Sequence, residues 1–163
     1  MNKSYDMFET WLSYTKPVMP VIVINQLEDA VPLANALFDG GIKLIEVTLR
    51  TPSGIMVIEK LTQTFPEMIV GAGTVVSVEQ VDQVKTAGGK FIVSPGFSMA
   101  IAERAEKLGI AYLPGVETPT EIMMALEKGY TFLKFFPAAQ AGGIDMLKAF
   151  SGPFPQVKFC PTG

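Results

Sequence analysis

The sequence predicts a single α/β domain over residues 1–163, in which parallel strands form a barrel behind an N-terminal helix at residues 3–15. Three observations predict this fold. Short β-rich segments recur with their centres about 20 to 26 residues apart, the spacing of consecutive βα units. Helix start and stop signals lie between these segments. One strand alternates apolar and polar residues, which favours a barrel over a sheet that is buried on both faces.

The predicted strands are seven segments rich in β-branched and aromatic residues: 18–24, 44–50, 69–75, 91–96, 111–116, 132–138 and 157–163. Helical signals separate these segments from one another. We therefore expect neighbouring strands to run parallel, each followed by a helix that returns the chain to the same edge.

The N-terminal helix is predicted from apolar residues that share one helical face, namely Tyr5, Phe8, Trp11 and Leu12. We expect this helix to cover one end of the fold.

The later helices begin at capping residues. Thr51 and Thr118 are each followed by proline, the arrangement of an N-cap and a first helical residue. Glu121 completes a capping box with Thr118, and Ser77 with Gln80 predicts another. Glycines that favour a left-handed C′ position end the helices: Gly40, Gly41, Gly88, Gly89, Gly109 and Gly129.

The second predicted strand distinguishes a closed barrel from an open, doubly wound sheet. Its apolar residues alternate with its polar ones, Ile45, Val47 and Leu49 with Glu46, Thr48 and Arg50. A central strand of an open sheet would be apolar on both faces. We therefore favour the barrel, with Glu46, Thr48 and Arg50 pointing inward. An internal ion pair between Glu46 and Arg50 that fixes strand register is the structural alternative.

Lys134 lies within an apolar and aromatic run at residues 131–137. An ammonium group buried there is costly unless it is paired or loses its proton, and the neutral amine attacks carbonyl carbon. Imine chemistry is therefore the first hypothesis, and a lysine that extends from the strand end into solvent is the alternative. By alternation Phe132, Lys134 and Phe136 share one face, which sets Lys134 across the barrel mouth from Glu46.

Composition excludes several classes of function. The net charge is −3 without a basic block, so no nucleic-acid partner is expected. No signal peptide opens the chain, and no uncharged apolar run reaches the roughly 18 residues of a membrane span, so we expect a cytoplasmic protein without membrane contact. The absence of histidine excludes Ser-His-Asp triads and histidine-bound zinc. The single cysteine, Cys160, is expected to be a small buried hydrophobe.

A glycine-rich segment at residues 71–74 has the first two glycines of a dinucleotide-binding fingerprint but not the third. We expect these glycines to allow a close approach by a ligand or a neighbouring strand. Thr74 follows them at the strand end, where its hydroxyl can donate to a substrate.

Seven motifs occur in order at 20–23 (PVIV), 45–51 (IEVTLRT), 70–75 (VGAGTV), 94–96 (SPG), 113–116 (LPGV), 134–138 (KFFPA) and 159–163 (FCPTG). Through them residues 17–163 resemble the class I, Schiff-base-forming aldolases of 2-keto-3-deoxy-6-phosphogluconate (KDPG) and 4-hydroxy-2-oxoglutarate (KHG). The resemblance implies a (β/α)8 TIM barrel, a homotrimer, no metal or other cofactor, and a place in the Entner–Doudoroff pathway of carbohydrate metabolism. The implied ligand is a 2-keto acid, with or without phosphate.

The same resemblance implies a role for each matching residue. Lys134 would form the imine and Glu46 would act as the general acid and base. The remaining matches would bind substrate: Arg50 and Thr74 at the carboxylate, Pro95 and Phe136 at the pocket wall, and Thr162 and Gly163 at the start of the phosphate site.

The sequence ends after the seventh predicted strand and the sixth barrel helix, so we expect a barrel truncated before strand eight and its last helices. A non-catalytic aldolase-like subunit that keeps the site residues without turnover is therefore an alternative. Another phosphate-binding barrel enzyme, such as a thiamine phosphate synthase, is a weaker one, because the sequence shows no clear carboxylate cluster for magnesium.

Overall fold

The structure is a computed structural model that describes residues 3–13 and 15–163, with the side chains of Lys3 and Tyr5 outside the described part. Parallel strands alternate with helices along the chain, which confirms the α/β class. The strands are β1 (Val21–Ile22), β2 (Leu44–Thr48), β3 (Ile69–Gly73), β4 (Phe91–Val93), β5 (Ala111–Leu113), β6 (Gly115–Val116), β7 (Phe132–Phe135) and β8 (Lys158–Pro161). The helices are α1 (Lys3–Ser13), η1 (Leu27–Asp29), α2 (Ala30–Asp39), α3 (Gly54–Thr64), α4 (Val78–Thr86), α5 (Met99–Leu108), α6 (Pro119–Glu127) and α7 (Gly143–Ser151).

The strands form two parallel sheets, β1-β2-β3-β4-β5 and β6-β7-β8. The sheets meet within residues 111–116, which the sequence predicts as one strand. Pro114 divides this strand because proline has no N–H to donate to a ladder. Its carbonyl still accepts a hydrogen bond from the Lys134 amide, at 2.9 Å. The two sheets therefore continue into each other, and β1 and β8 are their outermost strands.

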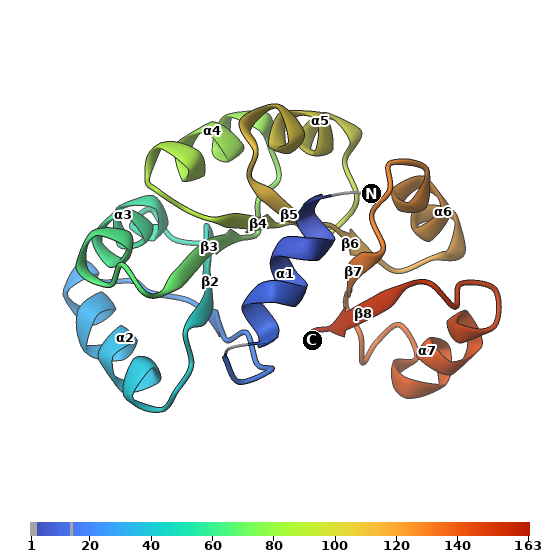
Figure 1. The fold of residues 1–163 in the computed structure, drawn as a ribbon, viewed down its shortest axis with the longest axis horizontal. Coiled ribbons are helices and arrows are strands. Elements are labelled where there is room, and N and C mark those ends of the chain that lie inside the picture. The colour runs from blue at the N-terminus through green and yellow to red at the C-terminus, as the bar shows by residue number, and fades with distance from the viewer. Residues whose placement is uncertain (1–2, 14) are drawn as a thin grey trace.

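Helices α2 to α7 lie outside the curved strands, in chain order from blue to red in Figure 1. The larger hydrophobic core fills the space between these helices and the strands. Val47 and Ile92 contribute to it from β2 and β4, and Ile58 and Ile122 from α3 and α6, each fully buried. Alternate strand residues therefore face the helices, as the sequence predicts for β2.

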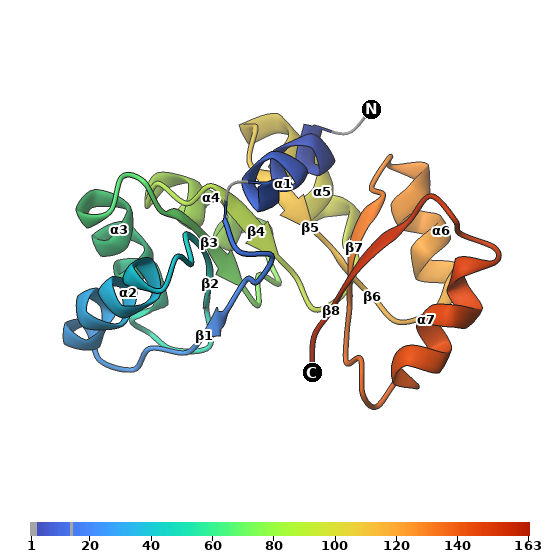
Figure 2. The same cartoon turned by 60° about the horizontal axis from the view of Figure 1, so that its bottom comes forward.

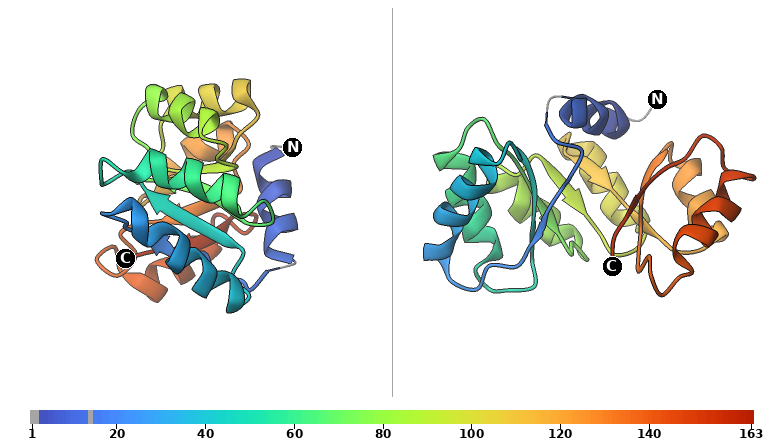
Figure 3. Two further views of the ribbon diagram at one scale, coloured as in Figure 1. Left: turned by 90° about the vertical axis from the view of Figure 1, so that its left-hand side faces the viewer. Right: turned by 90° about the horizontal axis from the view of Figure 1, so that it is seen from below.

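The opposite face of the strands lines an interior that α1 covers at one end (Figures 2 and 3). Phe8 of α1 contacts Phe91 and Phe132, the first residues of β4 and β7, with ring centroids 5.4 and 5.6 Å apart. The predicted cover is therefore confirmed, and it lies at the amino ends of the strands. The site described below faces the other end.

The predicted boundaries of α1 need correction. The described part of α1 ends at Ser13, and Thr15 lies beyond it as a bend. The Thr15 hydroxyl accepts a hydrogen bond from the Lys43 amide at 3.1 Å. Thr15 therefore contacts the segment just before β2 instead of extending the helix. The predicted contribution of the Tyr5 side chain, and Tyr14, lie outside the described residues.

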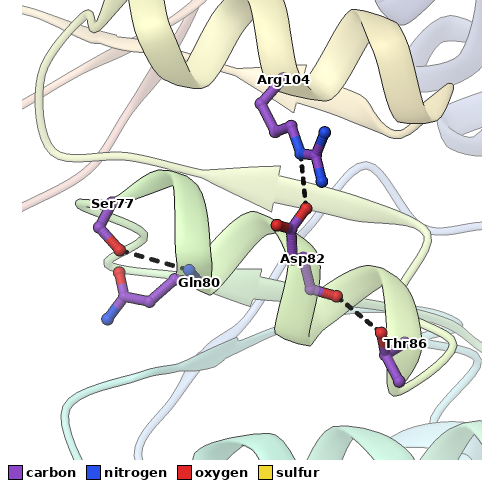
Figure 4. Close-up of polar contacts among 5 residues, drawn as sticks. All are labelled: Ser77, Gln80, Asp82, Thr86 and Arg104. Atoms are coloured by element: carbon purple, nitrogen blue, oxygen red, sulfur yellow. Dashed lines mark hydrogen bonds and ion pairs between the residues drawn. The ribbon is translucent and has the colours of Figure 1, made fainter.

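Two of the predicted helix starts are confirmed. Thr118 and Glu121 form the complete capping box. Ser77 caps α4 by accepting a hydrogen bond from the Gln80 amide, shown in Figure 4. The second hydrogen bond predicted for that box, from the Ser77 amide to the Gln80 side chain, is wrong. The Gln80 side chain accepts from the Val76 amide instead.

The predicted N-cap at Thr51 is also wrong. Helix α3 begins later, at Gly54, after Ser53. The hydroxyls of Thr51 and Ser53 both donate to the carbonyl of Ile24, at 2.8 and 2.7 Å. These bonds tie the loop after β2 to the loop after β1 and delay the start of the helix.

The helix stops follow the prediction in part. Among the glycines predicted to end helices, those with positive φ are Gly41, Gly88, Gly109 and Gly129. Gly40 keeps a right-handed conformation as the C-cap of α2. Gly89 does not have a positive φ either, because only one residue at each helix end needs the left-handed conformation and Gly88 has it.

The strands are shorter than predicted. β1 spans only Val21–Ile22 because Pro17 and Pro20 precede it and lack N–H groups. The other strands end at or before the predicted residue, where their carboxyl ends turn into loops. Among the described residues, no helix has the length and apolar character needed to cross a bilayer.

Candidate active site

Glu46 and Lys134 meet inside the curved sheet. Glu46 lies on β2 and Lys134 on β7, strands that face each other across the interior in Figure 1. The Lys134 Nζ lies 3.7 Å from the Glu46 Oε1, and the two residues are 4% and 1% exposed. The structure therefore brings together the two residues that the sequence places on facing strands. The separation is that of an ion pair but too long for a hydrogen bond.

Gly73 makes room for the Glu46 carboxyl. A β-carbon at residue 73 would collide with the Glu46 Oε1. By strand register Glu46 pairs with Gly71, and Gly73 pairs with Thr48. The Glu46 side chain therefore leans along β2 toward the carboxyl end of the strand, the end at which barrel enzymes carry their chemistry.

Burial raises the pKa of the Glu46 carboxyl above its usual range, against the opposing pull of Lys134 and Arg50. The cause is the loss of water around the charged form. A carboxyl of this kind holds its proton to a higher pH than an exposed glutamate does, which suits a group that must both accept and return a proton. Arg50 is itself exposed and acts on Glu46 through charge alone.

Two buried polar atoms of this interior, the Glu46 Oε1 and the Thr48 Oγ1, have no hydrogen-bond partner among the residues that the structure describes. Buried oxygens are normally paired, because an unpaired one costs roughly 1 to 3 kcal/mol. Unpaired oxygens beside a buried amine indicate a site built to receive polar atoms of a ligand or water.

Lys134 is enclosed by its neighbours in the sheet. In register, it pairs with Gly115 on β6 and Cys160 on β8. Its Nζ lies 5.2 Å from the centre of the Phe136 ring, so the predicted shared face of Lys134 and Phe136 is confirmed. The Pro95 carbonyl lies against the α-carbon of Gly115, where a β-carbon would collide with it. Pro95 thus borders the strand next to the lysine.

Arg50 and Thr74 meet at the carboxyl ends of β2 and β3. The Arg50 Nε donates to the Thr74 Oγ1 at 3.1 Å. Thr74 has a φ of 59°, in the left-handed region that a β-branched residue rarely adopts. Strain of this kind costs of order 1 to 3 kcal/mol and occurs most often at functional sites. It holds the Thr74 hydroxyl against the guanidinium.

A cavity of about 440 Å³ opens between the outermost strands and reaches Glu46. Val21 of β1 and Cys160 of β8 lie on its two sides, and Thr162 lines it beyond β8. Burial raises the pKa of the Cys160 thiol, with Glu46 adding to the effect. Cys160 is only half-buried, a correction to the predicted fully buried residue, because β8 is an outermost strand.

Thr162 and Gly163 continue β8 past its end. The Thr162 amide donates to the Phe135 carbonyl, and the carbonyls of Thr162 and Gly163 accept from Ala138 and Ala139. Gly163 has a φ of 97°, which glycine adopts readily. The structure thus brings Thr162 to the Glu46 cavity and sets Gly163 beside Phe136. It gives Pro95 and Gly163 no direct contact with Glu46 or Lys134 in the described contacts.

Sequence reasoning did not assign Gly73, Thr48 or Cys160 to the site. Alternation along β2 gave a signal for Thr48, since it shares a face with Glu46. Cys160 could have been found from the register of β7 and β8. Gly73 did have a signal, because the glycines of residues 71–74 predicted a close approach by a ligand or a neighbouring strand, and the side chain that approaches is Glu46 of the neighbouring strand β2.

Comparison with known proteins gives one family. The family described as KDPG and KHG aldolase matches residues 11–163. The 2-dehydro-3-deoxy-phosphogluconate aldolase of Pseudoalteromonas atlantica is 46% identical over 163 residues, which are 100% of this chain and 76% of the relative. The KHG/KDPG aldolase of Escherichia coli K12 is 46% identical over 149 residues, 91% of this chain and 70% of the relative.

Solved structures agree with this match. The KDPG aldolase of Legionella pneumophila, with pyruvate captured at low pH as a covalent carbinolamine, is 55% identical with a TM-score of 0.89, over 92% of this chain and 73% of its own. The Zymomonas mobilis enzyme with 3-phosphoglycerate is 42% identical with a TM-score of 0.89, over 94% and 73% of the two chains. The predicted TIM-barrel fold is therefore confirmed for the part of the barrel that this chain covers. The chain belongs to the KDPG and KHG aldolase family, a family of class I aldolases that break carbon–carbon bonds.

Proposed function

We propose that this chain cleaves 2-keto-3-deoxy-6-phosphogluconate to pyruvate and glyceraldehyde 3-phosphate, and 4-hydroxy-2-oxoglutarate to pyruvate and glyoxylate, through a Schiff base on Lys134. The observation that carries the proposal is the buried Lys134 amine 3.7 Å from the Glu46 carboxyl. A nucleophile beside a group that can move protons is what imine chemistry needs. The carbinolamine captured in the Legionella relative is the intermediate that precedes an imine, which supports the same route here.

The first stage forms the imine. The lone pair of the neutral Lys134 amine attacks the C2 ketone, and the carbonyl oxygen takes a proton to give a carbinolamine. That hydroxyl leaves as water after gaining a second proton, and the C2=N bond forms with nitrogen positively charged. Glu46 lies within reach to supply and remove these protons.

The second stage breaks the carbon–carbon bond. Glu46, directly or through one water, takes the proton from the C4 hydroxyl. The C3–C4 electron pair moves toward the positive nitrogen, so an aldehyde leaves and an enamine remains. The carboxyl then returns a proton to C3, and water hydrolyses the imine to free pyruvate. A carboxyl with a raised pKa serves both as the base and as the acid in this sequence.

Substrate binding divides between two places. Arg50 presents a planar guanidinium at the mouth, suited to the keto acid carboxylate, and Thr74 holds it there. Thr162 and Gly163 follow β8, the seventh strand of the barrel, and form the start of the phosphate site. In phosphate-binding barrels the backbone after this strand contributes to that site. Phe136 and Pro95 wall the pocket. The homotrimer and the cytoplasmic location stay predictions.

Trapping with borohydride tests the proposal. Pyruvate plus borohydride should add one reduced pyruvyl group to the chain, and peptide mapping should place it on Lys134. The variant Lys134→Ala should lose both the adduct and cleavage, with far-UV circular dichroism unchanged. The matched control Lys60→Ala removes an exposed lysine of α3 and should keep both.

Cleavage that persists in Lys134→Ala would refute the mechanism. A wild-type chain that folds but gives no adduct would instead favour the non-catalytic aldolase-like polypeptide.

A further inference from the structure

Thr48 is a polar residue of the interior to which the proposed mechanism gives no part. It lies on β2 two residues after Glu46, and the two α-carbons are therefore about 6.6 Å apart along one face of the strand. Its exposed fraction is 0%, and its hydroxyl has no hydrogen-bond partner in the described structure. A threonine that served only as a strand former would satisfy this hydroxyl or be replaceable by valine.

The Glu46 carboxyl extends to the level of Thr48. Its Oε1 occupies the place of a β-carbon on Gly73, and Gly73 is the residue that pairs with Thr48 in the β2–β3 ladder. Two unpaired oxygens, one from each side chain, therefore lie on the same face of the same strand at the same height. Neither atom has a hydrogen-bond partner among the described residues, so one water molecule bonded to both would satisfy the two oxygens together.

We infer that Thr48 is a positioning residue, whose hydroxyl holds one water molecule that also hydrogen-bonds the Glu46 carboxylate. This inference rests on the proposed aldolase function and deepens it. Such a water would accept from the Thr48 hydroxyl and donate to the carboxylate, each at the usual hydrogen-bond length of about 2.8 Å. Lys134, 3.7 Å from the carboxyl, is close enough to give the water a third partner.

The water gives Glu46 a defined route to the substrate carbon. In the imine of pyruvate a C3–H bond breaks and its electron pair forms the C2=C3 bond of the enamine. The electrons of C2=N return to nitrogen. The water takes the proton from C3 and gives one of its own protons to Glu46. The reverse step returns a proton to C3, so the water is regenerated and the Thr48 hydroxyl keeps its proton throughout.

Exchange of the pyruvate methyl protons in D2O isolates this step, because it needs the imine and the enamine but no aldehyde. Thr48→Val removes the hydroxyl and keeps the shape of the side chain, and Thr48→Ser keeps the hydroxyl. Proton NMR gives the exchange rate, and borohydride trapping gives the fraction of chain that carries the imine.

We expect Thr48→Val to lower the exchange rate roughly 10- to 100-fold, since misplacing a reacting group by about an ångström costs this much. Trapping of pyruvate should stay near the wild-type level, and Thr48→Ser should recover most of the rate. The acid limb of the exchange rate should move to higher pH in Thr48→Val, because a lost hydrogen bond to the carboxylate raises the pKa of Glu46 further.

Thr62→Val is the matched control, because it removes a hydroxyl that donates to the Ala87 carbonyl on the outer side of the fold. It should leave the exchange rate unchanged. Thermal unfolding of Thr48→Val should show that the variant folds.

An exchange rate and pH profile in Thr48→Val equal to those of the wild type would overturn the inference and leave the aldolase function standing. Equal losses in the valine and serine variants would also overturn it, because they would show a packing role. A wild type without exchange or trapping would overturn the proposed function together with the inference.

Discussion

Burial acts on Glu46 in two opposite ways. It removes water from the carboxylate and so raises its pKa, while the same enclosure brings the Lys134 amine close enough to favour the charged form. The first effect is the larger one. A carboxyl balanced in this way keeps its proton to a higher pH than an exposed glutamate does.

The pH dependence of cleavage should report this balance. Glu46 must be ionised to take the proton from the C4 hydroxyl, so activity falls as the pH drops through its pKa. Because that pKa is raised, the acid limb of kcat/KM should lie above the value of about 4.3 of an ordinary glutamate. Steady-state rates between pH 4 and 9 give the limb.

Glu46→Gln should lower kcat by roughly 10² to 10⁴ and abolish this limb, while borohydride still traps some pyruvate. An acid limb that survives in Glu46→Gln would mean that another group is the base.

The meeting of Lys134 with Glu46 could be predicted from sequence because side-chain direction alternates along every strand. That rule needs no knowledge of neighbouring strands. The glycines of residues 71–74 predicted a close approach, but the sequence could not show that Glu46 makes it at Gly73, since this depends on the register between β2 and β3 and on the lean of one side chain. The contact of Arg50 with Thr74 depends on the positive φ of Thr74, which the sequence does not predict for a threonine.

At the scale of elements, local and distant hydrogen bonds decide where helices begin. The box of Thr118 and Glu121 lies within one helical turn, and the sequence predicted it. The hydroxyl of Thr51 donates instead to Ile24, 27 residues away, and no local pattern reveals such a partner. Pro114 shows the converse, because its missing N–H is a local signal that could have revealed the division of residues 111–116, which the sequence pattern predicted as one strand.

An ion pair joins helices α4 and α5 outside the site. The Arg104 Nε donates to the Asp82 Oδ1 at 2.6 Å, as Figure 4 shows, and this bond lowers the pKa of Asp82. A carboxylate with a lowered pKa stabilises the fold above its unfolded pKa, and the gain is lost as pH falls through the folded value. Both side chains are partly exposed, so the gain is small and screened by salt.

Asp82→Asn should therefore lower the Tm slightly at pH 7, and the difference from the wild type should vanish at acid pH below the folded pKa of Asp82. Differential scanning calorimetry at several pH values checks this. In an Arg104→Gln background the same change should have no effect at any pH, because the pair is already broken. A difference that persists in that background would assign the effect to something other than the pair.

At the scale of the molecule, α1 closes the smaller hydrophobic cluster of the interior. Phe8 is 1% exposed and contacts Trp11 with ring centroids 5.3 Å apart, and Trp11 is the only tryptophan in the sequence. Fluorescence of Trp11 therefore reports whether α1 is docked. If α1 is part of the cooperative fold, fluorescence and far-UV circular dichroism should change together in urea.

Phe8→Ala should lower the free energy of unfolding by about 3 to 5 kcal/mol, the usual cost of emptying a buried phenylalanine site. Urea titration followed by both signals measures it. Met56→Ala, which truncates an exposed residue of α3, should stay within about 0.5 kcal/mol of the wild type. An early fluorescence transition in the wild type would show that α1 detaches before the strands unfold.

Most of the architecture followed from sequence because spacing, caps and alternation are repeated in every βα unit. The strand lengths did not follow, since ladder bonds end where loops turn away. That α1 covers one end of the fold followed from its one apolar face, whereas the structure shows that this end is formed by the amino ends of the strands.

Gly73 also limits how this chemistry could be redesigned by directed evolution. Even alanine at that position would place a methyl group where the proton carrier of the proposed reaction lies. Mutant libraries that vary this codon should therefore yield inactive clones almost entirely. Selection for unnatural aldehyde acceptors has more freedom at Thr162, which borders the same cavity without holding the carboxyl in place.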